Sequence, residues 1–338
     1  MSSREPSSVI FGCAGTSLSA SERDFFRDAD PLGFILFQRN CETPAQVRAL
    51  VAALRDSIGR ADALILIDQE GGRVQRLKPP HWRAYPAPAR LAALGGARAR
   101  EAIRLGARLI ADDLARLGIT VDCLPVLDIP AAGADPVIGD RAYGDTPEGV
   151  ATLGRAACEG LLEGGVLPVI KHVPGHGRAT VDSHLALPRV AAPQALLHAT
   201  DFAPFRALAD MPLAMTAHIV YTALDAERPA TLSRRVIDAV IRGDIGLDGL
   251  LLSDDLSMHA LGGSFAERTT GALAAGCDVV LHCNGDRVEM TEIATAARPL
   301  SAAGRTRLER AQQRRATAQP IDRPALEARF DALLAGEA

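Results

Sequence analysis

Titratable side chains are concentrated in one short stretch of the chain. Residues 171–177 read Lys-His-Val-Pro-Gly-His-Gly, and the sequence Asp-Ser-His follows at residues 182–184. The apolar run Val-Leu-Pro-Val-Ile at residues 166–170 precedes this stretch and is typical of a buried strand. In α/β proteins, side chains at the ends of parallel strands commonly form the functional site. This stretch is therefore the first candidate for chemistry.

A carboxylate and an imidazole two residues apart suggest general acid/base catalysis. Asp182 and His184 flank a single residue, so in an extended segment both side chains point the same way. The carboxylate then orients the imidazole and favours its protonated form near neutral pH. Such a pair donates a proton and recovers it later in the cycle. Gly175 and Gly177 predict a mobile loop that brings the pair over a substrate.

Two other interpretations of these histidines remain open. His172 and His176 have the i, i+4 spacing of a helical zinc site, but the Pro-Gly-His-Gly sequence of residues 174–177 disfavours a helix. A loop that wraps its histidines around a metal together with Asp182 is one alternative. Purely structural histidines are the other.

A second motif places two carboxylates directly after an apolar run. Residues 253–258 read Ser-Asp-Asp-Leu-Ser-Met and follow the leucines at 250–252. In a strand, Asp254 shares one face with alternate leucines and Asp255 lies on the other face. Only one of the two can face a reacting centre, and the alternation leaves open which one. Capping of the next helix by Asp255 or Ser257 is the structural alternative.

The elements around these motifs indicate a single-domain (β/α)8 barrel over residues 1–338. Short apolar runs alternate with helical patterning, as in residues 45–58 and 97–117, which implies right-handed crossovers and a parallel sheet. An open doubly wound sheet is the alternative, but no Gly-x-Gly-x-x-Gly turn follows the first run. The eight predicted strands are Val9 to Cys13, Gly33 to Phe37, Leu64 to Ile67, Ile119 to Leu124, Leu167 to Ile170, Leu213 to Thr216, Leu250 to Leu252 and Val279 to Leu281.

Polar side chains follow several of these predicted strands, and a barrel brings such strand ends to one mouth. They are Asp68 and Glu70, Asp128, Lys171 and His172, His218, and Ser253 to Asp255.

Composition excludes some classes of partner. The formal net charge of −4 argues against a nucleic-acid binder, and no run reaches the roughly 18 apolar residues of a membrane span. The start of the chain, residues 1–6, lacks the apolar core of a signal peptide, so we expect a cytoplasmic protein.

The six cysteines are scattered and predict buried free thiols. Five arginines in residues 305–315 predict a solvated helix face ahead of a last helix at 324–334.

Taken together, these motifs resemble those of the β-N-acetylglucosaminidases of glycoside hydrolase family three. The resemblance runs from about Val9 to Asn284 and includes the Lys-His-x-Pro-Gly-His-Gly, Asp-x-His and Ser-Asp-Asp-Leu-Ser-Met motifs in this order. It also includes Asp-Gln-Glu-Gly-Gly-Arg-Val-Gln-Arg at residues 68–76 and Gly-Phe-Ile-Leu-Phe at residues 33–37, with Arg39 and Asn40.

The resemblance implies roles for individual residues. It makes Asp254 the catalytic nucleophile, His184 the proton donor and later the base, and Asp182 the partner of His184. The residues that it implies for binding the terminal sugar are Asp68, Arg76, Arg141, Lys171 and His172.

The resemblance also implies a substrate and a setting. Similar proteins are single-domain bacterial barrels of the cytoplasm that recycle peptidoglycan by removing N-acetylglucosamine from 1,6-anhydro-N-acetylmuramic acid, with or without a stem peptide. We therefore expect a small-molecule muropeptide or amino-sugar substrate, a monomer, and no metal, cofactor, nucleic-acid or membrane partner. Three alternatives remain: substrate-assisted hydrolysis with Asp254 and Asp255, phosphorolysis, because a histidine acid does not repel phosphate, and a non-catalytic sugar sensor.

Overall fold

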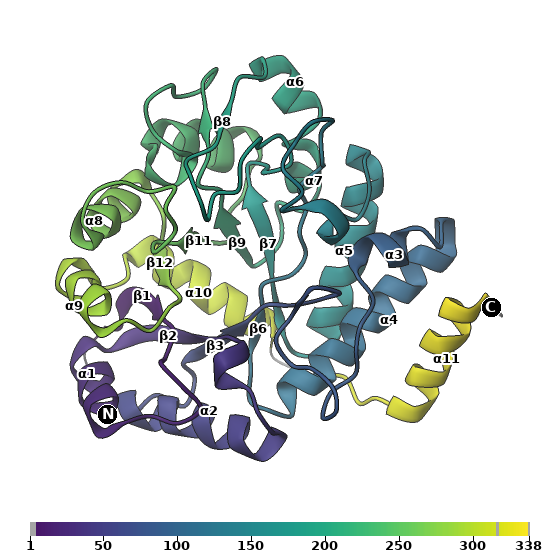
Figure 1. Cartoon of the computed structure of the whole chain (residues 1–338), viewed down its shortest axis with the longest axis horizontal. Helices are drawn as coiled ribbons and strands as arrows, with labels where there is room; N and C mark the ends of the chain where they lie inside the picture. Colours follow the sequence, from purple (N-terminus) through teal and green to yellow (C-terminus); the bar gives the residue numbers. More distant parts are fainter. Residues whose placement is uncertain (1–4, 316–317, 337–338) are drawn as a thin grey trace.

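Eight parallel strands form a closed barrel in the computed structural model, which describes residues 5–315 and 318–336 (Figure 1). The first strand pairs with both the second and the last, so the sheet has no edge and the open-sheet alternative is wrong. The predicted (β/α)8 barrel and its eight strands are confirmed. In order around the barrel they are β1 (Ser7–Phe11), β2 (Pro31–Leu36), β3 (Leu64–Ile67), β6 (Val121–Asp122), β7 (Leu167–Val173), β9 (Leu213–Thr216), β11 (Leu250–Asp255) and β12 (Val279–His282).

Alternation along the strands separates two hydrophobic cores. Ile10, Leu66 and Val169 belong to the cluster that fills the barrel interior. Phe11 and Ile67, one residue further along their strands, belong to the larger cluster between sheet and helices. This is the period of two expected of a strand buried on both faces.

Helices surround the barrel and begin at residues suited to capping. Thr43 accepts a hydrogen bond from the N–H of Gln46 and is followed by proline, and Ser19 and Ser264 form capping boxes. The two helices predicted at 45–58 and 97–117 are confirmed as α2 and α4. The longer helices are α1 (Ala20–Ala29), α2 (Pro44–Ile58), α4 (Gly96–Ala115), α5 (Pro147–Glu163), η4 (Val236–Asp244), α8 (Phe265–Ala275), α9 (Arg287–Ala296), α10 (Ala302–Arg314) and α11 (Arg323–Ala335).

Short strands and helices lie in the connections between the barrel strands and the longer helices. A β4–β5 hairpin follows β3, and β8 pairs with β10. Their bounds, with those of the short helices, are β4 (Gln69–Gly71), β5 (Val74–Gln75), β8 (Arg189–Val190), β10 (Val220–Tyr221), α3 (Pro88–Ala92), α6 (Gln194–Ala199), α7 (Ala203–Ala207), η1 (Gln38–Asn40), η2 (Gly139–Arg141) and η3 (Ala230–Leu232).

Helix α10 closes the amino-terminal end of the barrel. It crosses the middle of the barrel in Figure 1, and its Ala311 belongs to the interior cluster. Arg307 reaches inward, with Nη1 2.9 Å from Oδ1 of the buried Asp278 just before β12. The predicted solvated helix face is therefore wrong for Arg307, because the helix lies across the strand starts. The last helix, predicted at 324–334, is confirmed as α11, which packs on α4.

The other predictions about the whole chain have these outcomes. All six cysteines are free and buried, as predicted. Within residues 5–315 and 318–336, no helix is both long enough and apolar enough to cross a membrane. The predicted domain also includes residues 1–4, 316–317 and 337–338, which lie outside the described ranges, as does most of the amino-terminal segment that we expected to lack a signal peptide.

Candidate active site

A cavity of about 370 Å³ opens at the carboxyl ends of the barrel strands. Strands β7 and β11 contribute polar side chains to it, together with the segment after β3 and the loops after β6 and β7. The structure brings all eight predicted site residues to this one cavity. They are Asp68, Arg76, Arg141, Lys171, His172, Asp182, His184 and Asp254.

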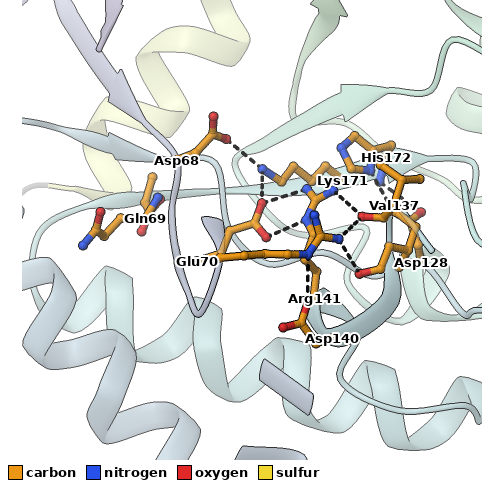
Figure 2. Close-up of polar contacts among 12 residues, drawn as sticks. Asp68, Gln69, Glu70, Asp128, Val137, Asp140, Arg141, Lys171 and His172 are labelled. Atoms are coloured by element: carbon orange, nitrogen blue, oxygen red, sulfur yellow. Dashed lines mark hydrogen bonds and ion pairs between the residues drawn. The ribbon is translucent and has the colours of Figure 1, made fainter. Parts of the chain in front are cut away.

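An ion network forms one wall of the cavity (Figure 2). Lys171 Nζ lies 2.9 Å from Oδ1 of Asp68 and 2.7 Å from Oε1 of Glu70. Arg141 donates two hydrogen bonds of 2.8 Å to the carboxylate of Glu70. Arg76 Nη2 donates to Oδ2 of Asp68 at 3.0 Å. Three cations and two carboxylates, from the segment after β3, the loop after β6 and strand β7, thus form one connected network.

These contacts keep Asp68, Glu70 and Lys171 charged. Burial alone raises the pKa of Asp68, but Lys171 and Arg76 more than offset it and hold that pKa below its usual range. Burial likewise acts against ionisation of Glu70, and the charges of Arg141 and Lys171 lower its pKa. The pKa of Lys171 is raised despite burial, because two carboxylates contact its ammonium group.

Glu70 was not among the predicted site residues, although it stood among the polar residues after the third predicted strand. Its side chain is fully buried and bridges Lys171 to Arg141. Charge balance was the available signal: Arg76, Arg141 and Lys171 with Asp68 alone leave an excess of buried positive charge. Arg141, by contrast, was predicted as a site residue, but only through the family resemblance. Its sequence context alone does not distinguish it from a surface arginine.

Asp128 organises a second part of the wall, at the end of β7. Its Oδ2 lies 2.7 Å from Nδ1 of His172, and its Oδ1 accepts the backbone N–H of His176 at 2.6 Å. Burial raises the pKa of Asp128, but His172 more than offsets this, so the carboxyl group stays ionised. The imidazole of His172 is thereby fixed with its Nε2 side free to face the cavity.

The two adjacent carboxylates of β11 have different surroundings. Asp255 is saturated by local donors: its Oδ2 accepts from Ser257 Oγ at 2.6 Å and its Oδ1 from the N–H groups of Ser257 and Cys283. Asp254 accepts only the N–H of Asp255, at 2.8 Å, among the hydrogen bonds of the described residues. Strand alternation puts Asp254 on the interior face with Leu252.

The charge of Asp254 is stabilised by its neighbours. Burial acts to raise the pKa of Asp254, but the field of His172 and the hydrogen bond from the N–H of Asp255 act against burial, and the pKa is lowered. A half-buried carboxylate that is ionised and has few hydrogen bonds is available to a ligand in the cavity.

Asp182 and His184 form the predicted pair. Asp182 Oδ1 lies 2.7 Å from Nδ1 of His184 and also accepts the N–H of His184 at 2.9 Å. The segment is a turn rather than the extended segment that we expected, since the N–H of Leu185 bonds to the carbonyl of Asp182. The side chain of His184 is 64% exposed at the cavity rim.

The glycines of the His-rich loop have a packing role that the sequence did not indicate. A Cβ on Gly177 would lie 1.8 Å from the carbonyl oxygen of Ile129, and Gly175 has a φ of 139° and lies against Asp201. Residues 173–177 are buried. These glycines allow close approach of the backbone, so the predicted mobility has no support at residues 175–177.

The described residues hold no group of three or more His, Cys, Asp or Glu side chains suited to a metal ion. His172 and His176 lie with ring centroids 5.6 Å apart, and each is fixed through Asp128. Residues 172–176 are the end of β7 and a turn rather than a helix, so the helical zinc geometry is wrong.

A closed (β/α)8 barrel with an ionised carboxylate, a carboxylate–imidazole pair and a network of charged side chains around its mouth is typical of a barrel enzyme for a small polar substrate. The model of the glycosyl hydrolase family 3 N-terminal domain matches residues 16–318. The β-hexosaminidase of Alkalilimnicola ehrlichii is 42% identical over 283 residues, which cover 82% of this chain and 80% of that protein. The β-hexosaminidase of Pseudomonas aeruginosa is 40% identical over 294 residues, 86% of each chain.

A solved structure of NagZ from Neisseria gonorrhoeae, in complex with N-trifluoroacetyl-D-glucosamine, superposes with a TM-score of 0.86 at 31% identity and covers 99% of each chain. The chain belongs to glycosyl hydrolase family 3 and is a glycoside hydrolase of the β-hexosaminidase class.

Proposed function

We propose that the protein is a retaining exo-β-N-acetylglucosaminidase in which Asp254 forms a covalent glycosyl-enzyme and His184, paired with Asp182, is the acid/base. The contrast between the two carboxylates of β11 carries this proposal. Both carboxylates line the cavity, but the oxygens of Asp255 accept hydrogen bonds from Ser257 and Cys283, whereas Asp254 accepts only one backbone N–H among the described residues.

The reaction proceeds in two steps. An oxygen of Asp254 attacks the anomeric carbon, the bond to the leaving oxygen breaks, and His184 gives its proton to that oxygen. The neutral imidazole of His184 then takes a proton from water, and the resulting hydroxide attacks the anomeric carbon and releases Asp254. The product is β-configured N-acetylglucosamine. A histidine in this role departs from the usual pair of carboxyl groups.

The network of charged residues supplies the binding site for the terminal sugar. Asp68, Arg76, Lys171, Arg141 and His172 line the cavity, and their fixed donors and acceptors suit hydroxyl and acetamido groups. The N-trifluoroacetyl-D-glucosamine in the similar NagZ structure supports an N-acylated glucosamine as the ligand.

For the natural substrate we propose N-acetylglucosaminyl-1,6-anhydro-N-acetylmuramic acid, with or without stem peptide, hydrolysed by a cytoplasmic monomer during peptidoglycan recycling. The support is the family resemblance and the names of the relatives, which are β-hexosaminidases.

The hydrogen bonds of Asp255 argue against substrate-assisted hydrolysis, because both of its oxygens already accept protein donors and are less available to orient an acetamido group. Phosphorolysis is the second candidate, since the acid/base is an exposed imidazole with no negative charge to repel phosphate.

One experiment separates these reactions. The purified, chelator-treated protein is incubated with an aryl β-N-acetylglucosaminide and with the anhydromuramic disaccharide, with and without phosphate, and products are analysed by mass spectrometry. We expect free N-acetylglucosamine from both substrates. Sugar 1-phosphate would make the enzyme a phosphorylase. A slow fluorosugar should add its mass to the peptide that contains Asp254, and an unlabelled protein under turnover conditions would contradict the covalent mechanism.

A further inference from the structure

The segment that carries the acid/base pair has a buried stem and an exposed tip. Residues 173–177 are buried, and Tyr221 Oη donates to the carbonyl of Gly175 at 2.7 Å. In the tip, residues 180–186, one side chain alone is buried: Ser183, which is 2% exposed. Since Ser183 lies between Asp182 and His184, whatever holds it also places the catalytic pair.

The contact of Ser183 with the stem is a single side-chain hydrogen bond. Its Oγ lies 3.1 Å from Nε2 of His176. His176 is 3% exposed and cannot shift freely, because its N–H is bonded to Asp128 and its ring packs at 5.6 Å against that of His172. One carboxylate, Asp128, thus supports both a sugar-binding histidine and the contact to the catalytic turn.

The direction of this hydrogen bond follows from the environment of the ring. Burial, followed by the charge of His172, lowers the pKa of His176 to about 4, so the imidazole is neutral near pH 7 and carries one N–H. Nδ1 is buried and has no partner in residues 5–315 and 318–336. A buried N–H without an acceptor is the costlier arrangement, so the proton resides on Nε2 and is donated to Ser183 Oγ.

We propose that His176 is a positioning residue for the acid/base: through its Nε2–H bond to Ser183 it holds the Asp182–His184 turn over the cavity. This inference rests on the proposed role of His184. Among the described residues, the other hydrogen bonds of the turn to a different segment come from the residues after β11. The N–H of Ala260 bonds to the carbonyl of Ser183 at 3.2 Å, and Nδ1 of His259 bonds to the carbonyl of His184 at 3.0 Å. The turn is therefore held between the stem and the strand that carries Asp254.

The test compares two aryl β-N-acetylglucosaminides, one with phenol and one with dinitrophenol as leaving group. Only the phenol needs a proton in the transition state, so misplacement of the acid lowers kcat/KM for the phenyl substrate selectively. We expect Ser183→Ala to lower it about 5- to 10-fold more than for the dinitrophenyl substrate, the equivalent of one hydrogen bond.

A matched pair of variants at position 176 locates the hydrogen bond. Glutamine places an amide N–H near Nε2, whereas asparagine places it near Nδ1, where no partner exists. We expect His176→Gln to keep the wild-type ratio of the two kcat/KM values and His176→Asn to change it as Ser183→Ala does. Adding Ser183→Ala to His176→Asn should change nothing further. Thr180→Ala, at an exposed position of the same tip, is the control and should behave as wild type.

Equal losses on both substrates in Ser183→Ala, or equal ratios for His176→Gln and His176→Asn, would overturn the proposal. His184→Ala distinguishes the two levels of inference. If His184→Ala shows no dependence on the leaving group, the acid/base assignment fails. If it shows the dependence and Ser183→Ala does not, only the positioning role of His176 fails.

Discussion

At the scale of single residues, the two carboxylates of β11 should respond oppositely to substitution. Asp254→Asn removes the group proposed to attack the substrate but few protein contacts, so we expect kcat to fall by about three orders of magnitude or more with an unchanged unfolding temperature. Asp255→Asn disturbs the hydrogen bonds from Ser257 and Cys283, which we expect to lower the free energy of unfolding by about 1–3 kcal/mol. Steady-state kinetics and urea unfolding measure the two effects. The reverse pattern would exchange the roles of Asp254 and Asp255.

The sequence located the candidate site well, because strand ends of a barrel must meet at one mouth. It could not assign partners across the barrel. Glu70 and Asp128 stood among the polar residues at strand ends, yet only the fold shows that Glu70 contacts Arg141 and Asp128 contacts His172. The first pair is separated by 71 positions in the sequence and the second by 44. Spacing along the chain carries no information on such contacts, and the requirement to neutralise buried charge gives only their number and sign.

At the scale of elements, the His-rich loop gives a test between packing and hinge roles for its glycines. We expect Gly177→Ala to lower both the unfolding temperature and the activity, because the new Cβ would lie 1.8 Å from the carbonyl oxygen of Ile129. Gly262→Ala is the control, since a Cβ there meets no atom within 4 Å. Thermal unfolding followed by circular dichroism makes the comparison. An unchanged unfolding temperature with altered kinetics in Gly177→Ala would instead favour a hinge.

Helix α10 offers a second test at this scale, on how the barrel is closed at its amino-terminal end. Arg307 contacts the buried Asp278, which also binds Arg242 and the N–H of Leu251. We expect Arg307→Ala to lower the free energy of unfolding by about 1.5–3 kcal/mol, the range for hydrogen bonds to charged groups.

Arg310→Ala on the same helix breaks a pair with Asp248 whose side chains are 51% and 63% exposed, and should leave the free energy of unfolding nearly unchanged because solvent screens the pair. Urea unfolding quantifies both substitutions, and kcat should change in neither. An equally small loss of stability in both variants would mean that the ion pairs of α10 contribute little and that its apolar face holds it on the barrel.

Helices and strands were predictable where their own residues carry the hydrophobic pattern that marks them. All eight barrel strands came from short apolar runs, since interior strands are buried on both faces. Strands β4 and β5 have no such run, because they form a hairpin held by tertiary contacts such as that of Gln69 with Leu77. The arginines of residues 305–315 were wrongly predicted to be solvated as a group, because the contacts of Arg307 are also tertiary. A charged helix face reads as solvated unless its acidic partners, here before β11 and β12, are known to lie beneath it.

At the scale of the whole molecule, the buried titratable groups predict how stability depends on pH. His176 and His218 are buried in neutral form, and burial lowers the pKa of each from its ordinary value of 6.5, to about 4 for His176. Between the folded and unfolded pKa values of these histidines, the unfolded chain therefore binds more protons than the folded protein. The stability from these groups is fully present above pH 6.5 and is lost as pH falls through their folded pKa values.

The carboxylates add to this loss at lower pH. Lys171, Arg141 and His172 hold the pKa values of Asp68, Glu70 and Asp128 below their ordinary values, against the effect of burial. Their contribution is present above about pH 4.5 and disappears as pH falls further, since protonation breaks the network.

We therefore expect the unfolding temperature to begin falling near pH 6.5, well before the carboxylates titrate, and to fall more steeply below pH 4.5. His176→Gln should flatten the part between pH 6.5 and 4.5, because glutamine takes up no proton on unfolding, whereas His81→Gln, at an exposed position, should leave the profile unchanged. Scanning calorimetry from pH 7 to 4 measures this. A constant unfolding temperature between pH 7 and 5 would mean that His176 and His218 take up protons in the folded barrel as readily as in the unfolded chain, and this would contradict their burial in neutral form.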